Sequence, residues 1–483
     1  MNAYEQGLRH AAGGRHADAI GCFEQALGTA PNDTRVLFAL GNTARALGMA
    51  GPAEAFFRQV LSLEPQRIEA LVNLANLLRS QGQFDAAEQV LTPALARAPD
   101  SAELWLTMGS VKRETGDVAG AVAHYHRALA LRPNYAAALG NLADLADDTE
   151  TALALYDRVL RLEPDDAQAR MNRAVLHLLK GDLKSGWRDY EARKKLPGKV
   201  PAATHGLPAW TGDSRKRLLV TAEQGVGDQI MFASLVPELG ANIVLECEPR
   251  LVPLFQRSFP SAKVHAWDVE TRGGVATARY GWLKHAGGAN QAVAMGTLPR
   301  HLRKDIASFP SPHAYLVPDA DEAARWRAVF GPAIGICWRS GKTGGHRALQ
   351  YAPLEAWAAF LRRWPGTAVS VQYDATPDEI AQLETMSGRR IAVPQGIDQK
   401  NELDRACALL KALDAVVSAP TAVSWLAAGA GVATFKILYD NSWTSFGERH
   451  EPFAPSCACV MPDKAGDWAQ CFDQVIRMLP APA

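Results

Sequence analysis

Prolines recur at a fixed interval through the first third of this chain of 483 residues. They end successive segments of 34 residues at Pro31, Pro65, Pro99 and Pro133, and Pro164 follows after a shorter interval of 31. A small residue stands twelve positions before each proline and a bulky residue eight positions before it: Ala19, Ala53, Ala87, Ala121 and Ala152, then Phe23, Phe57, Leu91, Tyr125 and Tyr156. Since proline ends a helix and small residues let two helices cross closely, the pattern predicts stacked helical pairs.

A 34-residue period of helix-turn-helix units is typical of tetratricopeptide (TPR) repeats, and the chain resembles that family over residues 1–195. The resemblance implies an α-solenoid with a concave groove that holds a partner protein. Turn-forming strings, GGRHA, GMAGPA, QGQFDA and TGDVAG, mark the unit boundaries. A sixth unit, ARMNRAVLHLLKGDLKSGWRDYEAR, has no closing proline, and we expect it to cap the solenoid and join it to the next domain.

Asparagines recur at one register of the repeats, eight residues after a unit-ending proline. They are Asn73, Asn141 and Asn172. This register lies on the first helix of a repeat, which lines the groove, and an amide offers a peptide backbone both a donor and an acceptor. They are therefore candidate acceptor-groove residues. The alternative is that these amides satisfy neighbouring turns or face water.

The composition narrows the class of protein. Lys plus Arg and Asp plus Glu both total 51, which gives no basic excess for nucleic acid, and 48% hydrophobic residues indicate a globular chain. The seven cysteines are scattered without paired CxxC motifs, so we expect no metal site and a reducing compartment. MNAYEQGLRH lacks the apolar core of a signal peptide, and we expect a cytoplasmic protein.

The segment 415–435 carries no charge and is long enough to span a bilayer. It is interrupted by polar residues, by Pro420 and by two glycines. A buried strand followed by a turn and a packed helix explains it better, so we expect no membrane insertion.

After Arg193 the helical pattern stops, and KKLPGKVPAATHGLPAWTGDS is expected to be a linker. Short apolar strands then alternate with helices, which predicts parallel sheets covered by helices. The expected strands span 218–222, 242–247, 262–267, 333–338, 369–373, 390–393, 414–419 and 433–438. Two doubly wound (Rossmann-like) α/β domains, 205–320 and 321–483, are predicted to face each other across a cleft, with ligands at the carboxyl ends of the strands.

Three loops at such strand ends carry candidate site residues. AEQGVGDQIM places Gly225, Gly227 and Asp228 where a helix begins, so backbone N–H groups there can meet an anion. Asp228 also has a plain structural explanation, as the cap of that helix. ICWRSGKTGGHR gathers Arg339, Lys342, His346 and Arg347, which suit a phosphate unless they form only a solvated turn. SAPTAVSWLAAGAG begins a third helix after Ser418.

The strand, glycine turn, GD and helix around Asp228 resemble the opening of ADP-heptose glycosyltransferases of the GT-B fold. That resemblance implies that Asp228 is the general base and that the helix start near Thr421 holds donor phosphate. The chain departs from the family's DTS-and-His pattern with Pro420, Ala422 and Trp425. Candidate donor-binding residues are Gly225, Gly227, Arg339, Lys342, Arg347, Ser418, Thr421 and Ala422.

The strings GWRDYEAR, PAWTG, AEQGVGDQIMFA, CWRSG, SAPTAVSWLAAGA and SFGERHEPFAP together resemble TPR-containing glycosyltransferases that modify flagellin. The resemblance implies a metal-independent protein O-glycosyltransferase without a cofactor. Its groove would recruit flagellin, and a nucleotide sugar, such as a CMP-linked nonulosonic acid, would be its co-substrate. Phe446, Gly447 and Arg449 would border the donor.

Two alternatives stay open. The altered segment around Pro420 and Trp425 favours a non-catalytic TPR scaffold or chaperone whose transferase domain no longer turns over. A glycan-building enzyme with a lipid-linked acceptor is the third hypothesis, and a TPR array suits it less well.

Overall fold

A computed structural model describes residues 2–198, 201–212, 216–223, 225–272, 275–309, 314–341 and 350–479. The chain forms two compact units, Met1–Ala169 and Arg170–Ala483, and the boundary falls within one helix.

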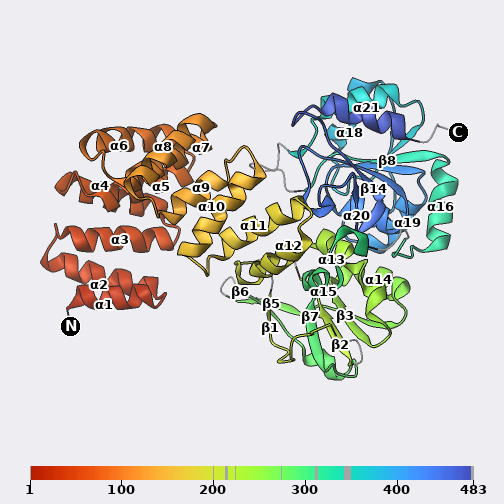
Figure 1. The fold of residues 1–483 in the computed structure, drawn as a ribbon, viewed down its shortest axis with the longest axis horizontal. Helices are drawn as coiled ribbons and strands as arrows, with labels where there is room; N and C mark the ends of the chain where they lie inside the picture. The colour runs from red at the N-terminus through yellow and green to blue at the C-terminus, as the bar shows by residue number, and fades with distance from the viewer. Residues whose placement is uncertain are drawn as a thin grey trace. The chain divides into compact units, whose positions relative to one another are not determined.

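The first unit is a row of antiparallel helical pairs (Figure 1). Its helices are α1 (Ala3–Ala12), α2 (His16–Thr29), α3 (Thr34–Ala46), α4 (Ala50–Leu63), α5 (Ile68–Ser80), α6 (Phe84–Arg97), α7 (Ala102–Glu114), α8 (Val118–Leu131), α9 (Ala136–Ala143) and α10 (Thr149–Leu162). The helical solenoid expected from the proline spacing is confirmed. Each unit-ending proline follows the second helix of a pair, as the predicted pattern requires.

The repeated small and bulky residues form the contacts between paired helices. All five alanines and all five bulky residues of the pattern are buried. A further small position lies on each first helix, sixteen residues before the bulky one. At Gly41, an added Cβ would lie 2.6 Å from the ring of Phe57, and at Gly109 it would lie 2.6 Å from Tyr125. The ring therefore packs directly on helix backbone, which requires glycine there.

The sixth helical pair belongs to the second unit. α11 (Ala167–Leu179) and α12 (Leu183–Tyr190) place Leu178, Leu183 and Trp187 in the same core as the first and second sheets. Trp187 packs edge-on against Phe232, Phe446 and Phe453, with ring centroids 5.7 to 6.4 Å away. The division at Ala169 thus comes earlier than the expected boundary at residue 195, because α12 buries its apolar face within the α/β unit.

The second unit holds two parallel sheets and one small sheet (Figure 1). In the first parallel sheet the order is β4-β3-β2-β7, formed by β2 (Leu218–Thr221), β3 (Ile243–Cys247), β4 (Ala262–Ala266) and β7 (Gln291–Ala294). The small sheet has the order β1-β6-β5, from β1 (Ala202–Ala203), β5 (Val269–Arg272) and β6 (Val275–Ala278).

The second parallel sheet has the order β10-β9-β8-β11-β12-β14-β13, and only β13 runs antiparallel. Its strands are β8 (Ala333–Cys337), β9 (Thr367–Ser370), β10 (Ile391–Ala392), β11 (Ala415–Ser418), β12 (Ala433–Ile437), β13 (His450–Glu451) and β14 (Ala454–Val460). The helices after α12 are α13 (Val226–Ala233), α14 (Val252–Ser258), α15 (Leu298–Leu302), α16 (Ala320–Phe330), α17 (Leu354–Arg363), α18 (Pro377–Ser387), α19 (Leu403–Lys411), α20 (Ala422–Gly429) and α21 (Trp468–Met478).

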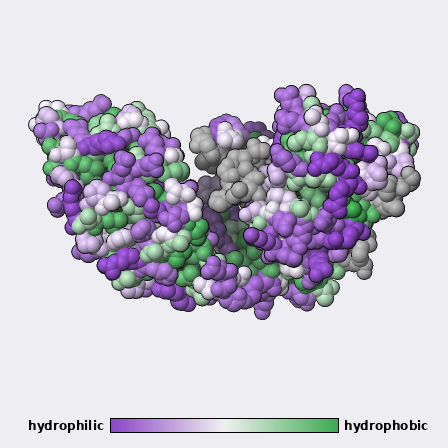
Figure 2. All heavy atoms as spheres, turned by 90° about the horizontal axis from the view of Figure 1, so that it is seen from above, coloured by the Kyte–Doolittle hydropathy of each residue, from purple (hydrophilic) through white to green (hydrophobic). Residues whose placement is uncertain are grey.

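The uncharged segment 415–435 forms β11, α20 and the start of β12, with β11 paired between β8 and β12. In the described part of the chain, no helix is long and apolar enough to cross a membrane. Hydrophilic side chains cover most of the face seen in Figure 2, with apolar ones between them.

The expected linker is partly built into the second unit. Trp210 is buried and donates its backbone N–H to the Ala292 carbonyl (2.8 Å), while the N–H of Ala292 donates to Pro208 (2.9 Å). Residues 208–210 therefore run along the edge of β7 as an extra strand-like segment. β7 itself and the small sheet are not among the strands expected from the sequence.

Candidate functional site

The strand orders place two switch points in the second unit. In the second sheet, β8 and β11 are neighbours from which the chain winds in opposite directions, and in the first sheet β2 and β7 have this relation. Ligands of doubly wound sheets bind outside the carboxyl ends of the strands at such points. The loops after β2, β8 and β11 are those that carry the predicted site residues.

A cleft of about 1350 Å³ opens at these carboxyl ends. Its walls include Gly225, Val226, Gly227 and Asp228 after β2, Glu248 and Arg250 after β3, Ser340 and Gly341 after β8, Tyr373 and Asp374 after β9, and Pro420, Thr421, Ala422 and Trp425 after β11. The lining combines residues of both sheets. The structure thus brings together Asp228, both loop glycines, Thr421 and Ala422, which the sequence suggested separately. Ser418 and Arg339 are not among the lining residues.

Two helix N-termini meet in this cleft. A Cβ added to Gly227 in the first turn of α13 would lie 3.6 Å from both Ala422 Cα and Trp425 Cδ1 in α20. Each helix N-terminus carries roughly half a positive charge, together with N–H groups that lack intrahelical acceptors. An anion that lies beside both helix ends, within the cleft, is therefore attracted by both.

Asp228 caps α13. Its carboxylate accepts the Gly225 backbone N–H at 3.2 Å, and the residue also lines the cleft. This hydrogen bond supports a structural role for Asp228 as a helix cap. A capping carboxylate on a cleft wall is also placed to meet a ligand hydroxyl, so its role as a general base stays a prediction.

Behind the same loop lies a buried ion pair that the sequence reasoning missed. Arg193, from the short helix after α12, donates to Glu223 at 2.5 Å, and both side chains are about 1% exposed. Glu223 also accepts the Gly296 N–H at 2.6 Å, and Arg193 also donates to Thr297 at 3.0 Å. The pair fixes the end of β2 to the end of β7. It joins the GWRDYEAR and AEQGVGD strings, which gave no sign of this contact because they lie 30 residues apart.

Glu246 is a second buried carboxyl beneath the loop. Its Oε2 accepts the Ala222 N–H at 3.0 Å and the Tyr280 hydroxyl at 3.3 Å, and Oε1 has no hydrogen-bond partner in the described structure. Burial raises the pKa of Glu246 to about 7, although both donors oppose the rise.

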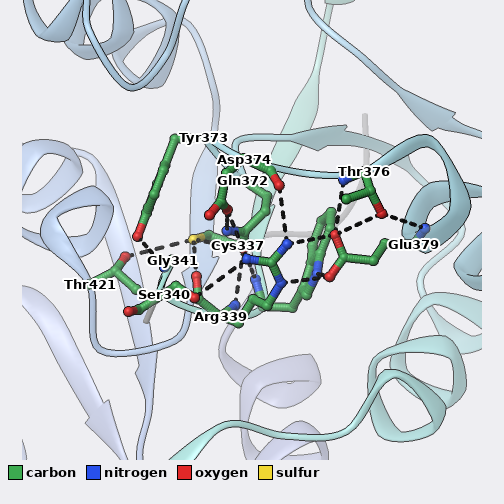
Figure 3. A network of polar contacts seen from close by, with 11 residues as sticks. Cys337, Arg339, Ser340, Gly341, Gln372, Tyr373, Asp374, Thr376, Glu379 and Thr421 are labelled. Atoms are coloured by element: carbon green, nitrogen blue, oxygen red, sulfur yellow. Dashed lines mark hydrogen bonds and ion pairs between the residues drawn. The ribbon is translucent and has the colours of Figure 1, made fainter. Parts of the chain in front are cut away.

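Arg339 was expected to contact a phosphate, and its guanidinium is occupied by protein (Figure 3). Nε and Nη2 donate to the two oxygens of Glu379 at 2.6 and 2.7 Å, and Nη1 donates to Asp374 at 2.9 Å. The paired hydrogen bond to Arg339 lowers the pKa of Glu379 to about 2. Arg339 thus anchors the loop after β8 to the start of α18, and contact with a ligand would require these ion pairs to break.

Side chains that follow β9 also accept hydrogen bonds from backbone N–H groups of the loop after β8 (Figure 3). Gln372 Oε1 accepts the N–H groups of Trp338 and Arg339, both at 3.0 Å, and the Tyr373 hydroxyl accepts that of Gly341 at 2.6 Å. The predicted strand 369–373 therefore ends early, at Ser370, and its last residues shape the neighbouring loop instead. Lys342, His346 and Arg347 lie outside the described residues.

The third predicted loop is built around α20. The Thr421 hydroxyl accepts the Val423 N–H at 3.3 Å, and Ser418 is buried and donates to the Ala419 carbonyl at 2.7 Å. Ser418 therefore supports the turn, while Thr421 and Ala422 line the cleft. Trp425 is wedged between Gly227 and the buried Lys436, whose ammonium lies 4.1 Å from the centroid of the tryptophan ring.

Phe446 and Gly447 do not border the cleft as expected. Phe446 packs between Trp187 and Phe309, with ring centroids 5.7 and 5.6 Å away, and Gly447 lies against the Leu179 carbonyl. The segment follows a central strand, which suggested a place at the cleft. Phe446 instead packs into the aromatic cluster around Trp187 and draws the segment away from the cleft.

The asparagines of the groove are partly buried on the first helices. Asn73 on α5 donates its amide to Asn42 on α3 at 2.8 Å, so this amide links neighbouring repeats. Asn141 lies on α9, and Asn172 lies on α11 in the second unit. Within the described ranges, no group of three or more His, Cys, Asp or Glu side chains is arranged to hold a metal ion.

Comparison with known families decides the nature of the helical part. The tetratricopeptide repeat family matches residues 4–68, 44–110, 106–149 and 138–193. The chain carries a TPR array. The last match reaches across α11 and α12, so the sixth pair is a TPR unit in sequence that packs in the core of the α/β unit.

The TPR chain is homologous to Protein FlbA of Caulobacter vibrioides, with 33% identity over 384 residues. The alignment covers 75% of this chain, so it extends beyond the repeats into the α/β unit, and it spans 64% of FlbA. Among solved structures, TTC0263, a thermophilic TPR protein of Thermus thermophilus, is 27% identical over 36% of this chain and 97% of its own, with a TM-score of 0.33. MamA of Desulfovibrio magneticus is 22% identical over 34% and 94%, with a TM-score of 0.30.

Proposed function

We propose that the second unit is a GT-B type, metal-independent glycosyltransferase and that the TPR array recruits its protein acceptor. The observation that carries the proposal is the meeting of the α13 and α20 N-termini at Gly227 and Ala422 in the cleft. A nucleotide sugar supplies the anion that such an arrangement favours, because its phosphate can accept N–H groups from both helices.

The charge of the lining supports helix dipoles as the source of this attraction. Among the described residues that line the cleft, Arg250 and Lys400 are the cations, and Asp228, Glu248 and Asp374 are carboxylates. Arg250 is itself paired with Glu248 at 2.7 Å. Side-chain charge in this part of the cleft therefore does not favour phosphate, so the helix ends have to supply the attraction.

Asp228 would act as general base. Its carboxylate takes the proton from an acceptor hydroxyl as the hydroxyl oxygen bonds to the anomeric carbon, and the bond from that carbon to the nucleotide phosphate breaks. The leaving phosphate keeps the electron pair, and the two helix ends stabilise its charge. The resemblance to flagellin-modifying transferases suggests a Ser or Thr hydroxyl of flagellin as the acceptor and a CMP-linked nonulosonic acid as the donor.

A non-catalytic TPR scaffold is the second candidate. The occupied guanidinium of Arg339 favours it, and so does Trp425, which stands where the resembled transferases have histidine, because a group that would contact the donor is lost in both cases.

Thermal-shift measurements with CMP, UDP, ADP and GDP separate the two candidates. A transferase is expected to be stabilised by at least one nucleotide, and ligand at a hundred times its Kd adds about 2.7 kcal/mol to stability. If none of the four raises the melting temperature of the second unit, the scaffold is the better description.

A further inference from the structure

A second cavity lies behind the cleft, and nothing in the proposed function uses it. This rear chamber, of about 830 Å³, lies between the small sheet, β7 and residues 196–198 and 201–211. Gly198, Pro201 and Ala276 line both the chamber and the cleft, so the two cavities are adjacent. Described residues of the expected linker thus form one wall of the chamber.

Small side chains keep the chamber open. Ala276 and Ala278 on β6, and Ala292 and Ala294 on β7, line it at positions where a larger side chain would fill the space. The alanines therefore leave an apolar surface without protruding side chains, on which an extended polypeptide with small side chains can pack.

Two histidines of the chamber, each packed on an aromatic ring, can form hydrogen bonds with a ligand. His301 packs on Trp210 with ring centroids 5.0 Å apart, and His205 packs on Tyr280 at 5.1 Å. Burial lowers the pKa of both histidines, so both are neutral at neutral pH. His205 Nδ1 accepts the Leu207 N–H at 3.0 Å, which leaves the hydrogen on Nε2 as a donor for a carbonyl oxygen.

The rim of the chamber is cationic. Lys194 is paired with Glu191 at 2.6 Å, while Arg300 is exposed and forms no ion pair with any residue that the structure describes. A carboxylate on the ligand is therefore favoured at Arg300.

We infer that the rear chamber binds an extended stretch of the acceptor polypeptide, next to the hydroxyl that receives the sugar. The stretch has small or apolar side chains against the alanine wall and an acidic residue at the rim. The inference rests on the proposed function, in which the acceptor is a protein. Asp228 lines the neighbouring cleft and not the chamber itself, so the chamber would hold residues of the acceptor that flank the reacting hydroxyl.

Hydrogen–deuterium exchange on the full chain tests the inference, because it separates binding in the chamber from binding along the repeats. The probes are overlapping synthetic peptides that together cover the flagellin encoded in the same genome. We expect at least one to slow exchange at 201–211 and 275–278. Protection confined to the first unit, or none at all, would overturn the inference.

Two variants and a control sharpen the test. Ala294→Phe should fill the chamber and abolish this protection, while Ala324→Phe on the exposed face of α16 should leave it unchanged. Arg300→Glu should weaken binding of acidic peptides at least fivefold without filling the cavity. Unchanged protection in Ala294→Phe, or unchanged affinity in Arg300→Glu, contradicts the inference.

The nucleotide measurement keeps the two proposals apart. Both chamber variants should be stabilised by the same nucleotide as the unaltered chain, because neither touches the helix ends. Slower exchange at the chamber, in a chain that no nucleotide stabilises, would support the peptide site and contradict the proposed transferase activity.

Discussion

Arg339 illustrates the limit of sequence reasoning at the scale of single residues. The sequence predicts that Arg339 follows the end of a strand, and in the structure it lies just after β8. Its partners Asp374 and Glu379 come 35 and 40 residues later, so nothing local indicates that the charge is already neutralised. The roles of Arg193 and Glu246 were missed for the same reason, because tertiary pairing defines them.

Glu246→Gln should change how stability depends on pH. A carboxyl whose pKa rises from 4.5 to about 7 on folding stabilises the fold below its unfolded pKa. That contribution is lost as pH rises through about 7. The full effect is on the order of 3 kcal/mol. The glutamine variant should therefore gain stability relative to the unaltered chain between pH 5 and pH 8.

Urea unfolding followed by tryptophan fluorescence measures this difference, since every tryptophan except Trp105 lies in the second unit. An equal difference between the two proteins at both pH values would mean that Glu246 does not titrate in this window.

At the scale of elements, prediction succeeded where several positions repeat the same information. Each helical pair is marked by a proline, an alanine and a bulky residue, and these three positions keep the same offsets from one another in all five units. β14 was missed because APSCACV is rich in small residues of low strand propensity, and it becomes a strand by pairing with β12. The four-residue β7 has no periodic signal long enough to separate it from a loop.

Gly227 tests the contact between α13 and α20. An added Cβ would meet Ala422 at an ordinary contact distance of 3.6 Å, so Gly227→Ala should fold at least as well as the unaltered chain. The branched side chain of Gly227→Val should force the helices apart, at a cost of about 1–3 kcal/mol. It should also abolish nucleotide stabilisation. A valine variant with unchanged melting temperature and nucleotide response would show that the two helix ends do not form one site.

For the whole molecule, the sequence predicts two parts but does not place the boundary between them. The sixth repeat looks like a TPR unit, because its helices follow the repeat pattern. Trp187 and Arg193 nevertheless face the core of the α/β unit, and only the structure reveals that core.

A chain that begins at Asp165 should therefore fold, whereas one that begins after Lys195 should not. The shorter chain lacks Trp187, whose loss costs about 3–5 kcal/mol. It also leaves Glu223 buried without Arg193, which costs a similar 3–5 kcal/mol. Together these approach the whole stability of a typical domain. Near-ultraviolet circular dichroism and a thermal melt distinguish the two chains, and a cooperative melt of the shorter one would contradict the assignment of α12 to the α/β core.

The most direct test of the central proposal is the intact mass of flagellin after incubation with this protein and candidate nucleotide sugars. The account predicts that flagellin gains the mass of one or more sugars with at least one donor. Asp228→Asn keeps an oxygen that can accept the Gly225 N–H, so it should fold, bind nucleotide and leave the mass of flagellin unchanged. Transfer by the asparagine variant at the unaltered rate would contradict the account, since Asp228 would then be only a helix cap.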